Sequence, residues 1–162
     1  MNYVGNITSK TKLIMWSTWF VASIFFAYQY ILRVMPSVIM QDLMQQFTLD
    51  AVLFGQFSGI YYIGYAAAHL PLGLLLDRYG TKRIMPACIL LAISGTLPII
   101  FAKNWVIGIV GRLFVGIGSS GAILSAFKVI YSGFGPEKFT RMLSFTVTIG
   151  LFGAIYGGAP LN

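Results

Sequence analysis

Two arginines lie within long apolar stretches of the chain, where ionisable side chains are costly and usually functional. Arg112 comes about seven residues into its apolar run, about 10 Å along a helix axis, so we expect it to face a cavity or the interior of a helix bundle. Arg33 ends another run and shares a helix face with Gln29 and Tyr30. These residue types predict binding of an anion. Structural alternatives stay open: Arg112 could snorkel outward or pair with a neighbouring helix, and Arg33 could place its head in external water.

A third candidate lies on a polar stripe. Ser58, Tyr62, Tyr65 and His69 recur at helical spacing along one face of an apolar run. In a membrane helix such a stripe lines a cavity or contacts other helices. His69 could carry a coupled proton, since imidazoles titrate near neutral pH. The alternative is that His69 donates to a backbone carbonyl freed by Pro71.

Residues for catalysis do not form a recognisable constellation. One His, one Cys and four acids give no carboxylate pair, triad or metal cluster within the apolar runs, and no phosphate-binding loop is present. The acids all lie at or near the ends of the runs: Asp42, Asp50, Asp77 and Glu137. We therefore expect no enzymatic activity, no metal and no cofactor.

Composition places the chain in a lipid bilayer. With 57% hydrophobic residues, 9% charged residues and a mean hydropathy of +0.81, its 162 residues fall outside the range of soluble domains. The net charge of +7 comes from basic residues that stand singly or in small groups between apolar runs. This distribution fits the orientation of a membrane protein, so we expect no nucleic-acid partner.

The elements that must position these residues are five apolar spans, each near the roughly 20 helical residues that cross a bilayer. After a tail at 1–12, a bundle at 13–162 is predicted, with spans at 13–34, 51–76, 84–102, 105–131 and 142–162. Trp16 and Trp19 are expected at the interface where the first span begins, and Asp50 as a helix cap. The segment 35–50 is expected to continue the first helix or to form a second, amphipathic one.

Basic residues also predict orientation. Segments on the same side as the N-terminus hold seven Lys or Arg, and those on the other side hold two. We therefore expect a multi-pass protein of the cytoplasmic (inner) membrane, with its N-terminus in the cytoplasm. The two groups are Lys10, Lys12, Arg78, Lys82, Arg83, Lys138 and Arg141 inside, and Lys103 and Arg33 outside.

The charged hinge at 73–83, GLLLDRYGTKR, joins two spans into a hairpin. Gly73 lets another helix approach closely, Gly80 permits the positive φ of a tight turn, and the basic residues cannot cheaply cross the bilayer. The hinge resembles G-x-x-x-D-R-x-G-[RK]-[RK] of the major facilitator superfamily of secondary transporters. The matching residues are Gly73, Asp77, Arg78, Gly80, Lys82 and Arg83, with Thr81 at a position that is often basic. The resemblance implies an all-α membrane fold, an incomplete N-terminal six-helix bundle, in which this loop acts as a conformational latch.

Other segments resemble the same family. The run RLFVGIG, which begins at Arg112, is similar to the fourth-helix pattern R-x-x-[Q]-G-x-G, with Val115 where Gln is common. This resemblance implies a role for Arg112 in substrate or proton coupling. YQYILRVMPS is similar to the first helix of organic-anion branches, which implies that Arg33 helps to hold an anion. GAIYGG resembles an antiporter signature, but Ala154 replaces its proline.

Glycines are expected where helices approach closely. Gly55 with Gly59 and Gly153 with Gly157 form G-x-x-x-G pairs. Two further glycines belong to the fourth-helix pattern, Gly116 and Gly118.

Together these features predict part of a secondary transporter that moves a small polar solute by alternating access, as a symporter or another ion-coupled or facilitative carrier. Organic anions and small peptides are the candidate solutes. Such proteins are built from three-helix units in inverted pairs, so we expect the missing C-terminal half or a complementary fragment as a partner, and an inactive chain alone. The alternatives are a non-transporting membrane subunit or assembly protein and, within the same class, a drug exporter.

Overall fold

The computed structural model describes residues 9–48, 50–101 and 104–158, apart from the side chains of 46 and 47. Within these ranges there is no strand, and the helices are α1 (Ser9–Val38), α2 (Met40–Phe47), α3 (Ala51–Tyr79), α4 (Thr81–Phe101) and α5 (Trp105–Gly158). The predicted all-α fold is confirmed. The start of the predicted tail, Lys103 and the last four residues lie outside the described residues.

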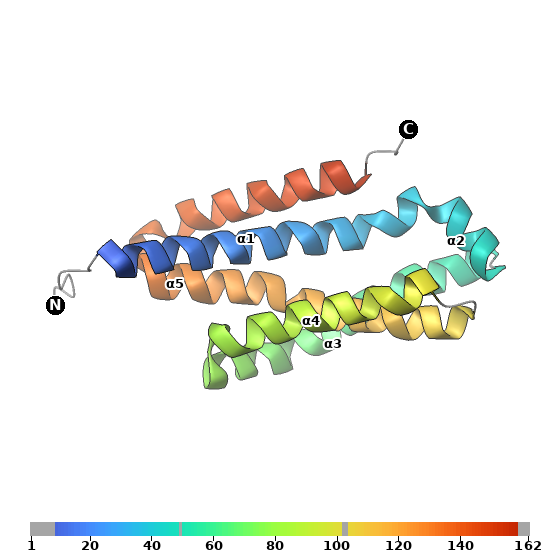
Figure 1. Cartoon of the computed structure of the whole chain (residues 1–162), viewed down its shortest axis with the longest axis horizontal. Coiled ribbons are helices and arrows are strands. Elements are labelled where there is room, and N and C mark those ends of the chain that lie inside the picture. The colour runs from blue at the N-terminus through green and yellow to red at the C-terminus, as the bar shows by residue number, and fades with distance from the viewer. Residues whose placement is uncertain (1–8, 49, 102–103, 159–162) are drawn as a thin grey trace.

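α5 consists of two helical halves joined at Gly135. This residue has φ 73° and ψ 172°, and Pro136 follows it directly. Figure 1 shows the two halves, 105–134 and 136–158, running in opposite directions. The sequence predicts a connection at 132–141 between the fourth and fifth spans, but in the structure only Gly135 interrupts the helix. Glycine accepts the positive φ without strain, and proline in a first helical turn needs no N–H partner.

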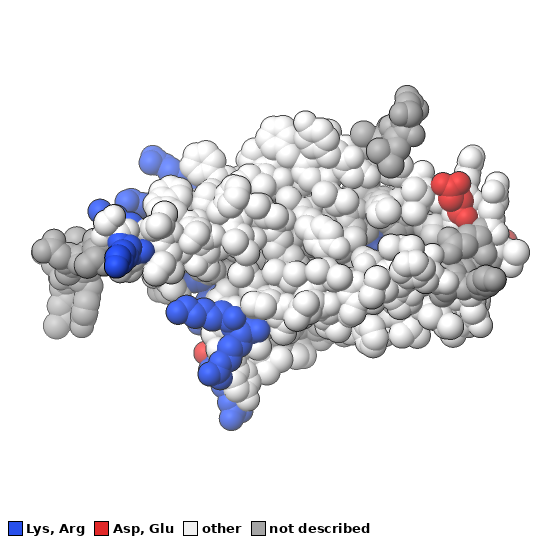
Figure 2. Space-filling view, viewed as in Figure 1, with Lys and Arg blue, Asp and Glu red and all other residues white. Residues whose placement is uncertain are grey.

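Among the described residues, four helices are long and apolar enough to span a membrane: α1, α3, α4 and the kinked α5. In Figure 2, Lys and Arg gather at the end of the molecule where α1 begins and where α3 turns into α4, and the middle of the visible face is largely uncharged. The basic ends of separate elements therefore meet at one end of the bundle.

α5 is the element around which the others pack. It has extensive contacts with α1, α3 and α4, whereas α3 and α4 contact each other sparsely. In Figure 1 its first half lies beside α3 and α4, and its second half runs along α1. Backbone approaches require glycine here: a Cβ at Gly153 would lie 2.6 Å from the carbonyl oxygen of Ala27, and one at Gly118 would lie 2.6 Å from that of Cys88.

The glycine pattern at 55 and 59 behaves differently. Gly153 and Gly157 pack against the backbone of α1, and Gly116 packs against Tyr61. A Cβ at Gly55 or Gly59, in contrast, would meet no atom within 4 Å. The expected close contact of this pair is therefore not made within the described chain.

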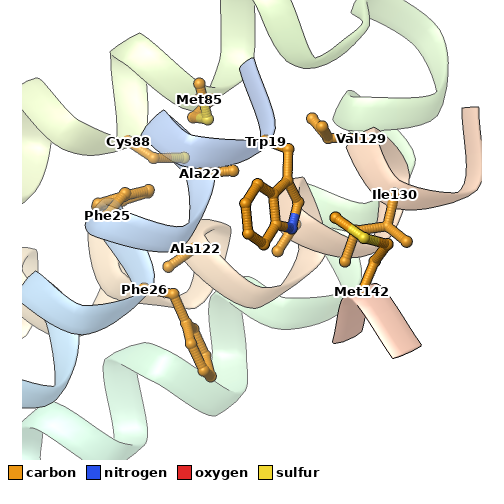
Figure 3. Packing of buried hydrophobic residues seen from close by; sticks show 11 residues of the cluster. Trp19, Ala22, Phe25, Phe26, Met85, Cys88, Ala122, Val129, Ile130 and Met142 are labelled. Carbon is orange, nitrogen blue, oxygen red and sulfur yellow. The ribbon is translucent and has the colours of Figure 1, made fainter. Parts of the chain in front are cut away.

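The main core lies between α1, α4 and both halves of α5. Figure 3 shows Trp19 and Phe26 of α1 among Cys88 of α4 and Ile130 and Met142 of α5. Trp19 was expected as an anchor at the membrane interface, and the structure shows that its side chain points into the bundle core. Its side chain is 9% exposed, and its Nε1 donates to Thr146 Oγ1 at 3.0 Å. The indole is buried because the second half of α5 supplies an acceptor for its N–H.

Two local signals are confirmed. Asp50 caps α3, with Oδ1 accepting a hydrogen bond from the backbone N–H of Leu53 at 2.8 Å. Gly80 ends α3 with φ 75°, and its N–H donates to the carbonyl of Leu76 at 3.0 Å. α4 begins at the next residue, so the hinge is as tight as its sequence predicts.

Candidate functional site

Arg112 lies in the interior of the bundle, with 3% of its surface exposed. Its Nη1 donates to the carbonyl of Leu32 at 2.7 Å, and its Nη2 to that of Arg33 at 3.4 Å. Its Cζ lies 4.8 Å from the ring centroid of Tyr61, a cation–π distance. Nε is buried without an acceptor among the described residues. Carbonyl dipoles and an aromatic ring, rather than a carboxylate of the described chain, surround this charge.

The carbonyl of Leu32 is available because of Pro36. Proline has no N–H, so the helical bond that residue 36 would donate to residue 32 is missing. α1 nevertheless continues as a helix through Pro36 to Val38. The guanidinium of Arg112 thus satisfies a buried backbone group that α1 cannot satisfy itself, which ties α1 to α5 at this level.

Tyr61 connects this buried arginine to the rest of the site. It is 1% exposed, and its hydroxyl donates to Gln29 Oε1, itself in a buried side chain, at 2.9 Å. Its ring stacks on Tyr65 at 6.1 Å and meets Tyr62 edge-on at 5.2 Å. Tyr61 was not among the predicted site residues. Its position beside Tyr62 puts it off the predicted stripe, and no local signal separates it from an ordinary core tyrosine.

Arg33 lies at the same level but on the exposed side of α1. Its Nε donates to Tyr62 Oη at 3.2 Å, and its Cζ lies 5.0 Å from the Tyr62 ring and 5.9 Å from the Tyr30 ring. Tyr62 is 48% exposed. The two arginines therefore occupy opposite sides of one layer: Arg112 is buried behind Tyr61, and Arg33 is exposed beside Tyr62.

His69 ends the polar stripe one turn beyond Tyr65. The two rings lie 5.3 Å apart with an interplanar angle of 34°. Nδ1 of His69 is buried and has no hydrogen-bond partner in the described part of the chain. That nitrogen therefore makes no bond to the carbonyl freed by Pro71, which was one of the two interpretations.

The hinge places its acid beside a lysine of α5. Lys128 Nζ lies 2.6 Å from Asp77 Oδ1, with the two side chains 39% and 71% exposed. The hinge arginines and Lys82 remain exposed, and Arg78 lies 5.4 Å from the ring of Tyr79. The sequence did not predict this ion pair, because its partners are 51 positions apart.

A cavity of about 380 Å³ opens beside the ion pair. Gly73 lines it, and a Cβ there would meet nothing within 4 Å, so no described helix makes the close approach expected at this glycine. The remaining lining residues are Leu76, Asp77, Leu124, Phe127, Lys128, Tyr131 and Phe139. The hinge therefore borders an open surface between α3 and α5.

The described residues contain no group of three or more His, Cys, Asp or Glu that could hold a metal ion. The candidate site is thus a layer of cations, hydroxyls and aromatic rings contributed by α1, α3 and α5. It has the chemistry to bind a polar solute through hydrogen bonds, charge and ring contacts.

Comparisons with known proteins identify the family. The sequence profile of the Major Facilitator Superfamily matches residues 15–161. A curated relative, the MFS-type transporter opaD of Aspergillus ustus, is 31% identical over 109 residues, which cover 65% of this chain and 19% of that protein. The matched part is thus about a fifth of the relative's length. No solved structure matches the chain significantly. The profile covers almost all of the chain, and the hinge of this all-α bundle carries the expected charges and glycines. The chain therefore belongs to the Major Facilitator Superfamily.

Proposed function

We propose that the chain forms part of a secondary transporter and that the exposed polar face of α1 and α3 binds a small, negatively charged solute. The observation that carries this proposal is the contact of Arg33 with Tyr62 on an exposed helix surface. A guanidinium, phenols and an imidazole are costly against hydrocarbon. Such a face is better matched to a water-filled pathway than to lipid.

Arg33 is suited to hold an anion. Its Nε is engaged by Tyr62, and the Tyr30 and Tyr62 rings flank the guanidinium, so its orientation is fixed before a solute arrives. The two terminal nitrogens donate to no described residue and can form a paired contact with a carboxylate or phosphate. At 4 Å, unit charges attract by about 4 kcal/mol at an effective dielectric of 20. That energy is enough to favour anions over neutral solutes of the same shape.

Arg112 supports this face from behind. It is a positioning residue: it holds the carbonyls of Leu32 and Arg33, so the end of α1 that carries the Arg33 side chain is fixed against α5. Gln29 and Tyr61 form the buried layer between them. Tyr65 and His69, both half-buried, continue the stripe from the exposed Tyr62 towards the basic end, where His69 can take part in proton coupling.

Topology follows from the distribution of charge. We place the basic end of the bundle in the cytoplasm, with the N-terminus, the hinge after Tyr79 and the kink at Gly135, and α2 on the opposite side of the membrane. With α5 counted as two crossings at its kink, we expect the described part of the chain to cross the membrane five times.

Alternating access in this family uses two helical bundles that move about a site between them. The bundle described here is one of these, so we expect no solute movement without the other. The chain is reconstituted in vesicles with and without a C-terminal bundle of a related transporter. Saturable uptake is expected only with both. Uptake by the chain alone would contradict the two-bundle requirement, and no uptake with either would favour a non-transporting subunit.

The solute class is tested in the two-bundle vesicles with labelled monocarboxylates, organophosphates, small peptides and cations. Arg33→Gln is expected to raise KM for anions about tenfold or more, and Tyr62→Phe to raise it less. Lys138→Gln, an exposed basic residue at the opposite end, is the matched control and is expected to leave KM unchanged. Equal KM values in the parent and Arg33→Gln would refute anion binding at this face.

A further inference from the structure

A second cavity lies where the end of α1, α2, α4 and the first half of α5 meet. Its volume is about 260 Å³. The walls are mainly apolar side chains, among them Leu43, Ile99 and Val115, and the polar residues that line it are Thr96 and Arg112. It shares no lining residue with the stripe of Tyr62, Tyr65 and His69. Arg112 and Leu32, which support the proposed solute face from behind, also line this cavity, but the cavity opens away from Tyr62 and is not used by the proposed solute.

The charge in this cavity has no counter-ion in the described chain. Arg112 is 3% exposed and uses one N–H of each terminal nitrogen on the carbonyls of α1. A guanidinium has five N–H donors, so the Nε donor and one on each terminal nitrogen remain. Nε is buried and unpartnered, and the ion pair between Lys128 and Asp77 lies at the other end of the bundle. A buried cation in this state favours an anion from outside the chain.

We infer that this cavity binds a small amphipathic anion, a carboxylate with a compact apolar body, at a site separate from the proposed solute pathway. The carboxylate meets Arg112 through the N–H groups that its two terminal nitrogens keep free, because Nε is buried away from accessible space. The apolar body lies against Leu43, Ile99 and Val115. A small hydrated inorganic anion would leave these apolar walls without partners.

Thr96 sets the direction of the ligand. Its hydroxyl donates to the carbonyl of Ile93 at 2.6 Å, so it presents only acceptor lone pairs to the cavity. An anionic group is therefore disfavoured beside Thr96 and favoured beside Arg112. Met35 and Ile100, which also line the cavity, are 43% and 61% exposed. They mark the side at which it reaches the surface.

The volume limits the size of the ligand. An apolar cavity of about 150 Å³ is large enough to hold benzene, so a space of about 260 Å³ accommodates a benzoate-sized molecule. A long acyl chain would not fit. The predicted ligand class is therefore the small aromatic or short aliphatic monocarboxylates, such as benzoate.

The test uses the full chain purified in detergent, with binding measured by calorimetry and by the shift of the unfolding temperature. Benzoate is compared with benzyl alcohol, which keeps the ring without the charge, and with chloride, which keeps the charge without the ring. Benzoate is expected to bind at least tenfold more tightly than either. Equal affinity for benzoate and benzyl alcohol, or no binding of benzoate, would overturn the inference.

Variants locate the site. Ile99→Phe fills the cavity and is expected to abolish benzoate binding, whereas Ile63→Phe, on an exposed face of α3, is the matched control. Arg112→Gln is expected to weaken benzoate at least tenfold and to leave benzyl alcohol unchanged. If Arg112→Gln does not fold, the binding of benzoate to Ile99→Phe and the comparison of benzoate with benzyl alcohol and chloride still show whether the anion binds in this cavity. Benzoate binding that survives Ile99→Phe but is lost in Arg33→Gln would place the anion at the proposed solute face, and the separate site would be rejected.

Discussion

Arg112 and Pro36 are joined through a single backbone oxygen. Pro36 leaves the carbonyl of Leu32 without its helical donor, and Arg112 Nη1 takes that place at 2.7 Å. A residue that costs a helix one hydrogen bond and a residue that is costly to bury thus compensate each other. The pair links the ends of α1 and α5 on which the candidate site is built.

This compensation predicts a coupling between the two positions. Arg112→Gln is expected to lower the free energy of unfolding by about 2 kcal/mol, because buried hydrogen bonds from a charged group are lost. In a Pro36→Ala background the new N–H can donate to Leu32, so the loss is expected to shrink by about 1 kcal/mol. Chemical unfolding of the two single variants and the double variant in detergent measures the coupling. Strictly additive losses would show that the carbonyl is not shared.

The ion pair of the hinge predicts an effect on function that exceeds its effect on stability. Exposed pairs contribute about 0 to 1 kcal/mol, so Asp77→Asn is expected to lower stability by less than about 1 kcal/mol. If the hinge is a conformational latch, the same change shifts the balance between inward- and outward-open states and alters transport rate.

The exchange of the two charges supplies the control for this prediction. Asp77→Lys with Lys128→Asp restores the pair and is expected to recover transport in part, while Glu137→Gln, also an exposed acid, has no effect. Transport and thermal unfolding are measured on the same preparations. If Asp77→Asn transports as well as the parent, the hinge is not a conformational latch and only fixes the orientation of the helices in the membrane.

The paired glycine patterns predict opposite responses to the same substitution. At Gly153 an added methyl group would lie 2.6 Å from the carbonyl oxygen of Ala27, whereas at Gly55 it would meet nothing within 4 Å. Gly153→Ala is expected to destabilise the chain by about 1 to 3 kcal/mol through overpacking. Gly55→Ala is expected to be neutral or to stabilise it by up to about 1 kcal/mol, because alanine is the better helix former. Similar unfolding midpoints for both variants would contradict the packing of α5 on α1.

Topology is tested by reporter fusions. Fusions after Asp50 and after Lys82 are expected to give opposite signals, and a fusion after Lys138 to match the one after Lys82. Equal signals at Asp50 and Lys82 would remove the proposed crossing of α3. A mismatch between Lys82 and Lys138 would contradict the placement of the hinge and the kink on one side.

Features fixed by neighbouring residues were predictable from the sequence. The hinge at Gly80, the cap at Asp50 and the apolar length of the helices each depend on a few adjacent positions. The start of the second half of α5 was placed too late, because a single positive-φ glycine can turn the chain where the sequence suggested a longer connection.

Features fixed by distant partners were not predictable. Trp19 has the composition of an interface anchor, and only Thr146, 127 positions away, makes it a core residue. Helical spacing likewise put Gly55 with Gly59 and Gly153 with Gly157 in one class, yet only the second pair packs within the described chain. Spacing shows which residues share a face but not what covers that face.

The bond from Trp19 to Thr146 also has a consequence for biosynthesis. Ser23 shares the same hydroxyl, at 3.1 Å, so α1 brings two polar groups into the core that only the second half of α5 can satisfy. At about 5 to 20 residues per second, a ribosome needs about 6 to 25 s to extend the chain by the 127 positions from Trp19 to Thr146. During that interval α1 is already made, but its partner is not. Of the described helices, α1 is therefore synthesised first, and its two polar groups stay without their partner in α5 until nearly the whole described chain has been made.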